Sequence, residues 1–157
     1  MSIDCNLRGN SSLDYTKFDI DMNAFVNQNS ITSPSNYVVI TSTNNKCTYI
    51  YEQKDNKWDL LYKWSCTVGK PSTPTIKGVF SIGKKYPAIG DDNSSVKYAI
   101  NITEQYYYHS ILYDARGLSV KDDTLGEAIS HGCIRLATSS AKWIFDNVPE
   151  GTTVITH

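Results

Sequence analysis

Several features that would assign this 157-residue chain to a common class of protein are missing. No apolar run approaches the roughly 20 residues that cross a membrane as a helix. The formal net charge is −1, so the positive field by which proteins attract nucleic acid is absent. These absences exclude a helical membrane span in this sequence and argue against a nucleic-acid-binding protein.

Paired metal-binding cysteines and a secretory signal are also missing. The four cysteines are Cys5, Cys47, Cys66 and Cys133, and none of them form a CxxC pair, so a structural zinc site is not expected. Cys47 and Cys66 fall on neighbouring predicted strands, where free thiols are favoured over a disulfide. The first thirty residues contain no apolar signal segment, which leaves a cytoplasmic protein or a piece of a longer exported chain.

The composition is that of a globular domain with a core. Hydrophobic residues make up 40% and charged residues 20% of the chain, and 157 residues suit a single domain. Tyrosine is abundant, with 11 residues against 4 phenylalanines. Tyrosine suits half-exposed sheet faces and clefts that receive polar ligands, and surface strands are the simpler explanation for most of these residues.

Hydrophobic periodicity predicts a mainly β domain over residues 37–157. Segment 1–36 is weakly patterned and is interpreted as an N-terminal leader or linker that packs partly on the domain, with a short helix or edge strand at 14–27. Strands are predicted at 37–41, 46–51, 58–66, 79–82, 96–103, 106–113 and 152–156. In the clearest of them, apolar residues alternate from Trp58 to Cys66, which predicts that the even-numbered face is buried.

The remaining segments are predicted loops and one helix. Residues 69–75 contain a glycine and two prolines, and residues 84–95 are irregular. Residues 114–129 have no clear period, and a loop of that length within a compact domain is often functional. A helix is predicted to begin at an N-cap on Thr138 and to end before Pro149.

The stretch Ser130–Leu136, SHGCIRL, carries the most specific chemistry. A cysteine attacks carbonyl groups as its thiolate, and a nearby imidazole can take the thiol proton. His109 reaches this region from another predicted strand and is favoured as the base, with His131 positioning the loop or contacting substrate. The N–H groups of Gly132 and Cys133 are candidate donors to an oxyanion. Arg135 can clamp a carboxylate or brace the loop.

Simpler interpretations of these residues stay open at this point. A single cysteine is more often a buried small residue than a nucleophile, and a strand histidine is more often part of a polar core. A metal site made of His109, His131 and Cys133 lacks a fourth ligand at supporting spacing.

The motif SHGC-x-R at 130–135 resembles the signature of the L,D-transpeptidase catalytic domain, the YkuD-type family. Three further segments are similar to that family: Tyr108–Ser110, the loop and strand at 73–80, and the helix, turn and strand at 141–154. The resemblance covers roughly residues 37–157. It implies a YkuD-type β-sandwich of mixed sheets with one short helix towards the C-terminus and a long active-site loop.

The resemblance also implies an activity and roles for individual residues. Cys133 would attack the stem peptide of bacterial peptidoglycan, release terminal D-Ala as a thioester forms, and pass the acyl group to a second stem peptide in a 3→3 cross-link. The implied site residues are Cys133 as nucleophile, His109 as base, the main-chain carbonyl of Ser110 orienting that base, His131 and Gly132 as the oxyanion segment, and Arg135, Ser130, Tyr98 and Tyr108 as substrate contacts.

The family implies no metal and no cofactor, sensitivity to carbapenems, and a location outside the cytoplasm in the bacterial cell envelope. An L,D-carboxypeptidase or a Cys-His peptidoglycan hydrolase on the same site is the main alternative, and a non-catalytic wall-binding module is another. The segment between His109 and Ser130 is longer than in many family members, with the extra residues at 114–126. This difference affects the predicted acceptor rather than the thiol chemistry.

Overall fold

A computed structural model describes residues 13–157, and its first sheet has five strands in the order β3-β2-β1-β13-β5. The strands are β1 (Tyr37–Ser42), β2 (Cys47–Lys54), β3 (Lys57–Ser65), β5 (Gly78–Ser81) and β13 (Thr153–Thr156). β1 pairs in parallel with β13, and the other neighbours are antiparallel. The sheet is therefore mixed, and the predicted meander β1-β2-β3 is confirmed.

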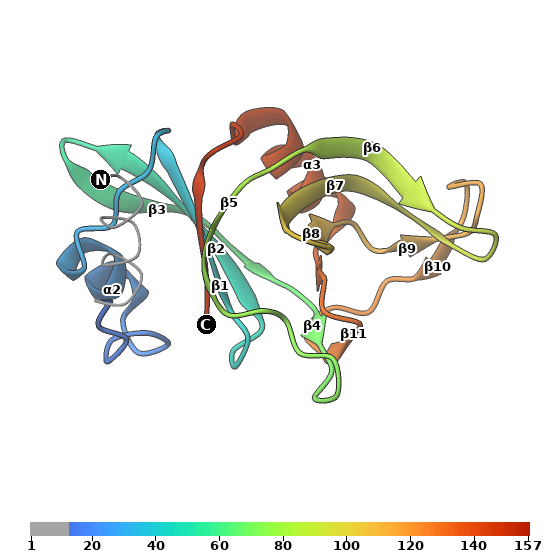
Figure 1. The fold of residues 1–157 in the computed structure, drawn as a ribbon, viewed down its shortest axis with the longest axis horizontal. Helices are drawn as coiled ribbons and strands as arrows, with labels where there is room; N and C mark the ends of the chain where they lie inside the picture. The colour runs from blue at the N-terminus through green and yellow to red at the C-terminus, as the bar shows by residue number, and fades with distance from the viewer. Residues whose placement is uncertain (1–12) are drawn as a thin grey trace.

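The second sheet carries the strands that lead to the SHGC motif. Its order is β10-β9-β7-β8-β12, with β6 beside β7, and a separate pair joins β4 to β11. The strands are β4 (Val68–Gly69), β6 (Lys85–Gly90), β7 (Ser95–Thr103), β8 (Tyr106–His109), β9 (Leu112–Tyr113), β10 (Val120–Asp122), β11 (Ala128–Ser130) and β12 (Ile134–Arg135). The two sheets form the two halves of the molecule, with the helix α3 (Thr138–Asn147) beside the second (Figure 1).

The main core lies between the two sheets and α3. Its fully buried members include Val39, Ile100, Ile134, Ile144 and Val154. These residues come from β1, β7, β12, α3 and β13, so strands of both sheets share one apolar interior. The predicted mainly β fold with mixed sheets and a late helix is confirmed.

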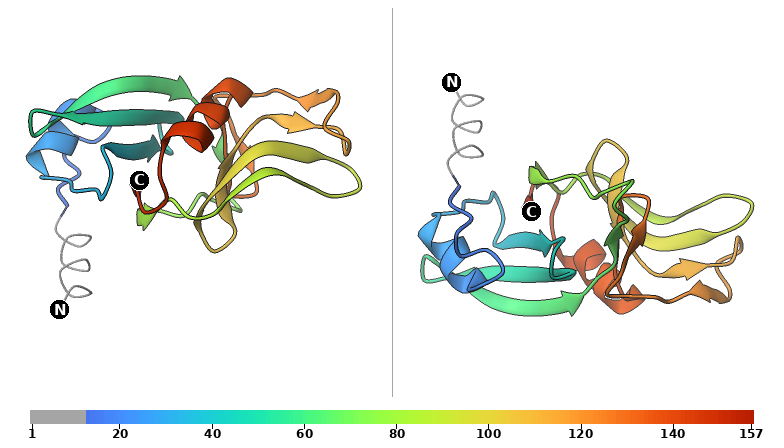
Figure 2. Two further views of the ribbon diagram at one scale, coloured as in Figure 1. Left: turned by 90° about the horizontal axis from the view of Figure 1, so that it is seen from above. Right: turned by 90° about the horizontal axis from the view of Figure 1, so that it is seen from below.

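A second apolar cluster lies between the first sheet and the helix α2 (Met22–Gln28). Asp21 caps this helix by accepting from the amide of Ala24, and Phe25 and Val26 are fully buried. Figure 2 shows α2 at the far end of the first sheet, away from the second. Segment 13–36 thus packs on the first sheet through α2, and apolar contacts cross the predicted boundary at residue 36.

The predicted burial of one face of β3 is wrong. Trp58 is buried against the α2 cluster, whereas Trp64 packs on the main core, and Leu60 and Tyr62 are 43% and 38% exposed. The cause is a register shift, because Tyr62 pairs with Ile50 while Leu60 pairs with the next residue of β2, leaving Leu61 as an extra residue. Such a bulge moves the following side chains to the opposite face of the sheet.

Two further local predictions are corrected. Segment 84–95, predicted to be irregular, contains β6, which pairs with β7 along its length. Thr138 is the first residue of α3 and not its N-cap; its hydroxyl bonds the hydroxyl of Tyr113 at 2.7 Å, and the N-cap Ala137 has no capping side chain.

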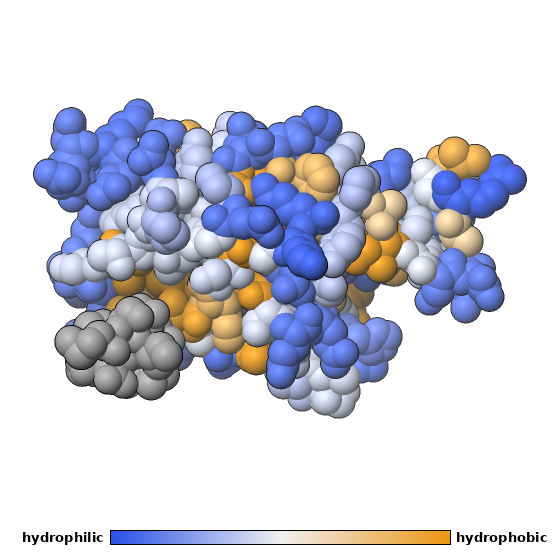
Figure 3. Space-filling model, turned by 45° about the horizontal axis from the view of Figure 1, so that its top comes forward, coloured by the Kyte–Doolittle hydropathy of each residue, from blue (hydrophilic) through white to orange (hydrophobic). Residues whose placement is uncertain are grey.

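The β6–β7 and β9–β10 hairpins project from the second half as an arm. Its surface is largely hydrophilic with apolar patches near the end (Figure 3). The exposed large hydrophobic residues in these hairpins are Tyr86, Ile89, Leu118 and Val120.

No helix within residues 13–157 is both long and apolar enough to cross a membrane. Cys47, Cys66 and Cys133 are free thiols, while Cys5 lies outside the described residues.

Candidate active site

The segment that carries Cys133 is a tight turn between β11 and β12. The hydroxyl of Ser130 donates to the carbonyl of Cys133 at 2.6 Å and accepts from the amide of Gly132 at 3.1 Å. One small side chain therefore closes the turn from both sides. Ser130 is only 9% exposed and its hydroxyl is used within the turn, and its substrate contact stays a prediction.

Only glycine fits the backbone conformation and the space at position 132. Its φ is +125°, and a Cβ atom added there would lie 2.8 Å from Cε1 of Tyr106. The ring of Tyr106 thus packs directly on the backbone beside Cys133. Glycine is required here by both the backbone conformation and the close approach of the ring.

Thr75 braces the turn from the neighbouring loop. Its buried hydroxyl donates to the carbonyl of Gly132 at 2.8 Å and accepts from the amide of Gly69 at 2.9 Å. The hydroxyl of Thr73 and the amide of Lys70 both bond the carbonyl of Ser130, at 3.0 and 2.9 Å. The predicted loop 69–75 therefore holds the Cys133 segment in place.

The pairing of β12 with β8 sets the relation between the thiol and the imidazole. The strands are parallel, with Ile134 beside Tyr108 and Arg135 beside His109. Ile134 and Tyr108 point into the core, so Arg135 and His109 lie on the opposite face. Cys133 directly precedes β12, two residues before Arg135. The structure brings Cys133, His109 and Arg135 to one end of the second sheet.

His109 is held in a single orientation by the next residue. Its Nδ1 lies 2.7 Å from the main-chain carbonyl of Ser110, so Nδ1 carries the proton and donates, and Nε2 keeps its lone pair. Burial lowers the pKa of His109 to about 4; the bond to Ser110 opposes this shift, and the charge of Arg135 adds to it. The imidazole is therefore neutral at pH 7.

The Cys133 thiol is half-buried beside β8. Its Sγ lies 3.7 Å from the carbonyl oxygen of Gln105. Burial raises the pKa of the thiol, while a backbone hydrogen bond from Tyr107 opposes the rise. The thiol of Cys133 and the imidazole of His109 are therefore both uncharged before a reaction begins. The thiol proton is transferred only during the reaction.

The two predicted oxyanion donors differ in their hydrogen bonds. The amide of Gly132 already donates to Ser130, so it is not free. No acceptor for the Cys133 amide is found among residues 13–157. His131 is exposed at the surface of the turn.

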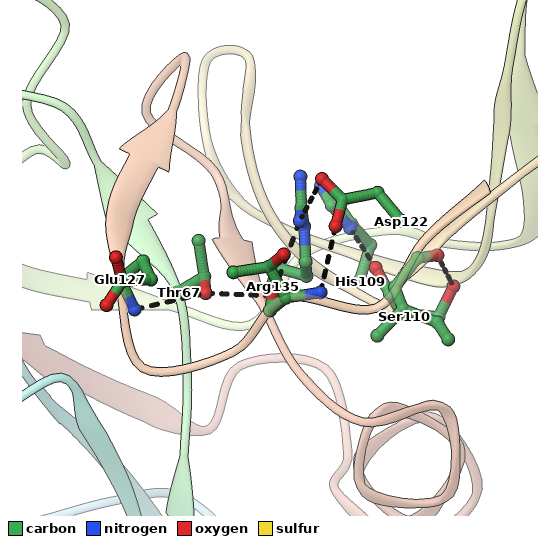
Figure 4. A network of polar contacts seen from close by, with 8 residues as sticks. Thr67, His109, Ser110, Asp122, Glu127 and Arg135 are labelled. Carbon is green, nitrogen blue, oxygen red and sulfur yellow. Dashed lines mark hydrogen bonds and ion pairs between the residues drawn. The ribbon is translucent and has the colours of Figure 1, made fainter. Parts of the chain in front are cut away.

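Arg135 braces the fold instead of facing outward to bind substrate. It is 6% exposed, and its Nη1 lies 3.2 Å from Oδ2 of Asp122 and 3.3 Å from the carbonyl of Thr124. Figure 4 shows the guanidinium of Arg135 directed at Asp122, beside His109. Of the two roles that the sequence left open, the structure supports bracing, and the predicted substrate contact is corrected.

Neither predicted tyrosine lines the site. Tyr108 is fully buried, and its hydroxyl bonds that of Thr41 in the core at 2.7 Å. The ring of Tyr98 packs on Phe145 of α3, with centroids 5.4 Å apart, on the core side of the sheet. Strand alternation places Tyr98 and Tyr108 on the face opposite His109.

The structure adds contributors that sequence reasoning did not identify. Thr75, Tyr106 and Asp122 all contact residues of the segment 130–136, but they lie 58, 27 and 11 positions before Cys133 in the numbering of the chain. Tyr106 is the only one with a sequence signal, because it lies on the predicted strand that carries His109. Within residues 13–157 no group of three or more His, Cys, Asp or Glu side chains is arranged to hold a metal ion.

Comparisons with known proteins agree with this architecture. Residues 35–156 match the protein family described as the L,D-transpeptidase catalytic domain. L,D-transpeptidase 2 of Mycobacterium tuberculosis is 29% identical over 97 residues, covering 56% of this chain and 24% of the relative. The chain thus spans about a quarter of that curated relative.

Solved structures show the same fold. A fused Zn-dependent amidase, peptidase and peptidoglycan-binding domain protein of Clostridium acetobutylicum is 36% identical, with a TM-score of 0.67, over 82% of this chain and 55% of that chain. LD transpeptidase LdtMt1, solved in complex with imipenem, is 25% identical with a TM-score of 0.63, over 78% of this chain and 59% of that chain.

Proposed function

Because the chain belongs to the family of L,D-transpeptidase catalytic domains, we propose that it transfers acyl groups between peptidoglycan stem peptides through a thioester on Cys133. The observation that carries the proposal is the His109–Cys133 arrangement. His109, whose neutral imidazole donates from Nδ1 to Ser110, is paired in register with Arg135, two residues after the half-buried thiol of Cys133. Its free Nε2 is the atom that can take the thiol proton.

In the first half of the proposed reaction, His109 Nε2 takes the proton of Cys133 as the sulfur attacks the carbonyl of the diamino acid of a tetrapeptide donor. The oxyanion accepts a hydrogen bond from the Cys133 amide. The C–N bond to D-Ala then breaks, the imidazolium returns its proton to the leaving amine, and the thioester remains.

In the second half, the side-chain amine of another stem peptide attacks the thioester carbonyl. His109 accepts a proton from this amine, the C–S bond breaks, and the thiolate takes the proton back. The product is a 3→3 cross-link, and the protein acts outside the cytoplasm, where the cell wall lies. Water as the acceptor would give L,D-carboxypeptidase activity, which product analysis distinguishes, because trimming to tripeptide yields no dimer.

Acylation by imipenem tests the nucleophile directly. A relative is solved in complex with this drug, and we expect intact-mass analysis to show one covalent adduct per chain. The adduct should disappear in Cys133→Ala and persist in Cys47→Ala, which removes another free and half-buried thiol. Survival of the adduct in Cys133→Ala would contradict the assignment.

The base is tested with the two histidines of the site. Replacement of His109 by Gln should slow acylation by about 10²–10⁴-fold, the usual contribution of a general base. His131→Ala should retain acylation close to that of the wild type because His131 is exposed. If only the His131 variant loses acylation, the base is assigned to the wrong residue.

A further inference from the structure

Asp122 and Arg135 form an ion pair that the proposed reaction does not use. Asp122 ends β10, and its side chain is 37% exposed, whereas the Arg135 side chain is 7% exposed. Among residues 13–157, Asp122 is the only carboxylate within ion-pair distance of Arg135. The buried positive charge is therefore balanced by a single partner from another strand.

The main chain of Arg135 is fixed to the strand of the base. Arg135 pairs with His109 in register, and the amide of Leu136 donates to the carbonyl of His109 at 2.8 Å. On its other side Arg135 exchanges two hydrogen bonds with Thr67, at 2.8 and 2.9 Å. A shift of Arg135 would thus be transmitted to His109.

Asp122 in turn organises the start of the segment that leads to Cys133. Its Oδ1 accepts from the amide of Thr124 at 2.9 Å and closes a turn. The carbonyl of Thr124 accepts from Arg135 Nη1 at 3.3 Å and from the hydroxyl of Thr67 at 3.1 Å. The turn, the guanidinium and Thr67 are thereby joined in one network (Figure 4).

Few other contacts hold the guanidinium in place. Its Nε is buried and has no hydrogen-bond partner within the described part of the chain, so the Nη1 contacts to Asp122 and Thr124 orient it. A guanidinium is always charged, and its field at His109 depends on how closely Asp122 neutralises it.

We propose that Asp122 is a positioning residue for the reaction: by pairing with Arg135 it fixes the turn before the Cys133 segment and sets the charge beside His109. Only the expected change in acylation rate rests on the proposed function. The charged group that acts on His109 is Arg135 on β12, and the guanidinium of Arg135 pairs with Asp122 on β10. The ammonium of Lys97 on β7 lies instead over the ring of Tyr113, 4.2 Å from its centroid.

The sign of the electrostatic effect follows from the geometry. The positive charge of Arg135 disfavours the imidazolium form of His109, and the negative charge of Asp122 opposes that effect. Removal of the Asp122 charge should therefore lower the pKa of His109. A residue that only supported the fold would leave this pKa unchanged.

Asp122→Asn is the test, with Asp122→Glu as the conservative variant and Asp123→Asn as the matched control on an exposed neighbour. The His109 imidazole is titrated by NMR, which requires no substrate, and imipenem acylation is followed across the same pH range. In Asp122→Asn we expect the His109 pKa to fall by several tenths of a unit and acylation at pH 7 to slow about 3- to 10-fold. Asp122→Glu should restore the pKa, and Asp123→Asn should match the wild type.

An unchanged His109 pKa in Asp122→Asn would overturn the proposal, even if acylation slowed, because the effect would then be structural. An unchanged acylation rate at pH 7 would overturn it as well, provided that the wild type reacts. If the wild type is not acylated at all, the proposed function is wrong, and the NMR titration alone decides whether Asp122 sets the charge at His109.

Discussion

His109 is a histidine that the fold keeps uncharged. Burial lowers its pKa from 6.5 to about 4, so between these values the unfolded chain binds a proton that the folded chain does not. Stability therefore falls as the pH drops from about 6.5 to about 4, and below about 4 this loss is complete. The shift corresponds to about 3 kcal/mol in the free energy of unfolding.

Urea unfolding at several pH values checks this expectation. His109→Gln removes the titrating group, so its stability should decline less between pH 6.5 and pH 4 than that of the wild type. His157, whose pKa is also lowered by burial, contributes to the decline in both proteins. Identical pH slopes for the wild type and His109→Gln would refute the role of His109, and His131→Gln serves as the exposed control.

The residues of the candidate site were partly predictable. Cys133 and His109 could be chosen from sequence because few cysteines and histidines are present and a motif surrounds one of them. The tyrosines were misplaced because residue type does not reveal which face of a strand a side chain occupies. Thr75 and Asp122 were not identified because their roles depend on contacts between segments that only the folded chain brings together.

Among the secondary-structure elements, the helix α3 is held at its C-terminal end by a lysine of the strand β6. Lys85 of β6 donates its ammonium hydrogens to the carbonyls of Phe145, at 2.9 Å, and Val148, at the C-terminal end of α3. Carbonyls at a helix end lack partners within the helix, and a positive charge there is favourable. Lys85 therefore links the β6–β7 hairpin to the helix that packs on β7.

Lys85→Met should destabilise the protein by about 1–2 kcal/mol, because the stem is kept and the charged hydrogen bonds are lost. Denaturant unfolding measures this cost, and Lys84→Met, on an exposed neighbour, should be close to neutral. Equal stability of the two variants would show that the helix end does not need Lys85.

Strand positions were predicted better than strand faces. Turn residues marked the hairpin between β2 and β3, where Asp55 and Asn56 both have positive φ, at 50° and 62°. The bulge at Leu61 could not be predicted, because it depends on how β2 and β3 pair rather than on the sequence of β3 alone. β6 was missed because its pairing with β7 compensates for a proline and a glycine at positions where a strand is disfavoured.

The molecule as a whole is built around a sheet that is covered on both faces. One face of the first sheet packs on the main core, and the other packs on α2. The family match begins at residue 35, so α2 lies outside it. The sequence predicted partial packing of segment 1–36, because its short apolar stripe lies among many polar residues.

Phe25→Ala tests whether α2 is an integral part of the domain. Phe25 is fully buried, and its truncation should cost about 3–5 kcal/mol, as for other buried aromatic residues. Ile20→Ala, at a residue that is 79% exposed, should change stability little. Thermal unfolding of both variants measures the difference in stability. A Phe25 variant as stable as the Ile20 variant would mean that the packing of α2 does not stabilise the domain.

The parallel pairing of β1 with β13 also bears on biosynthesis. Val38 lies beside Thr153, so the central ladder of the first sheet joins two segments that are far apart in the sequence. A chain whose synthesis stops after residue 140 contains both the thiol and the imidazole but lacks β13, the strand between β1 and β5, so we infer that the first sheet is completed only after the segment carrying Cys133 has been made.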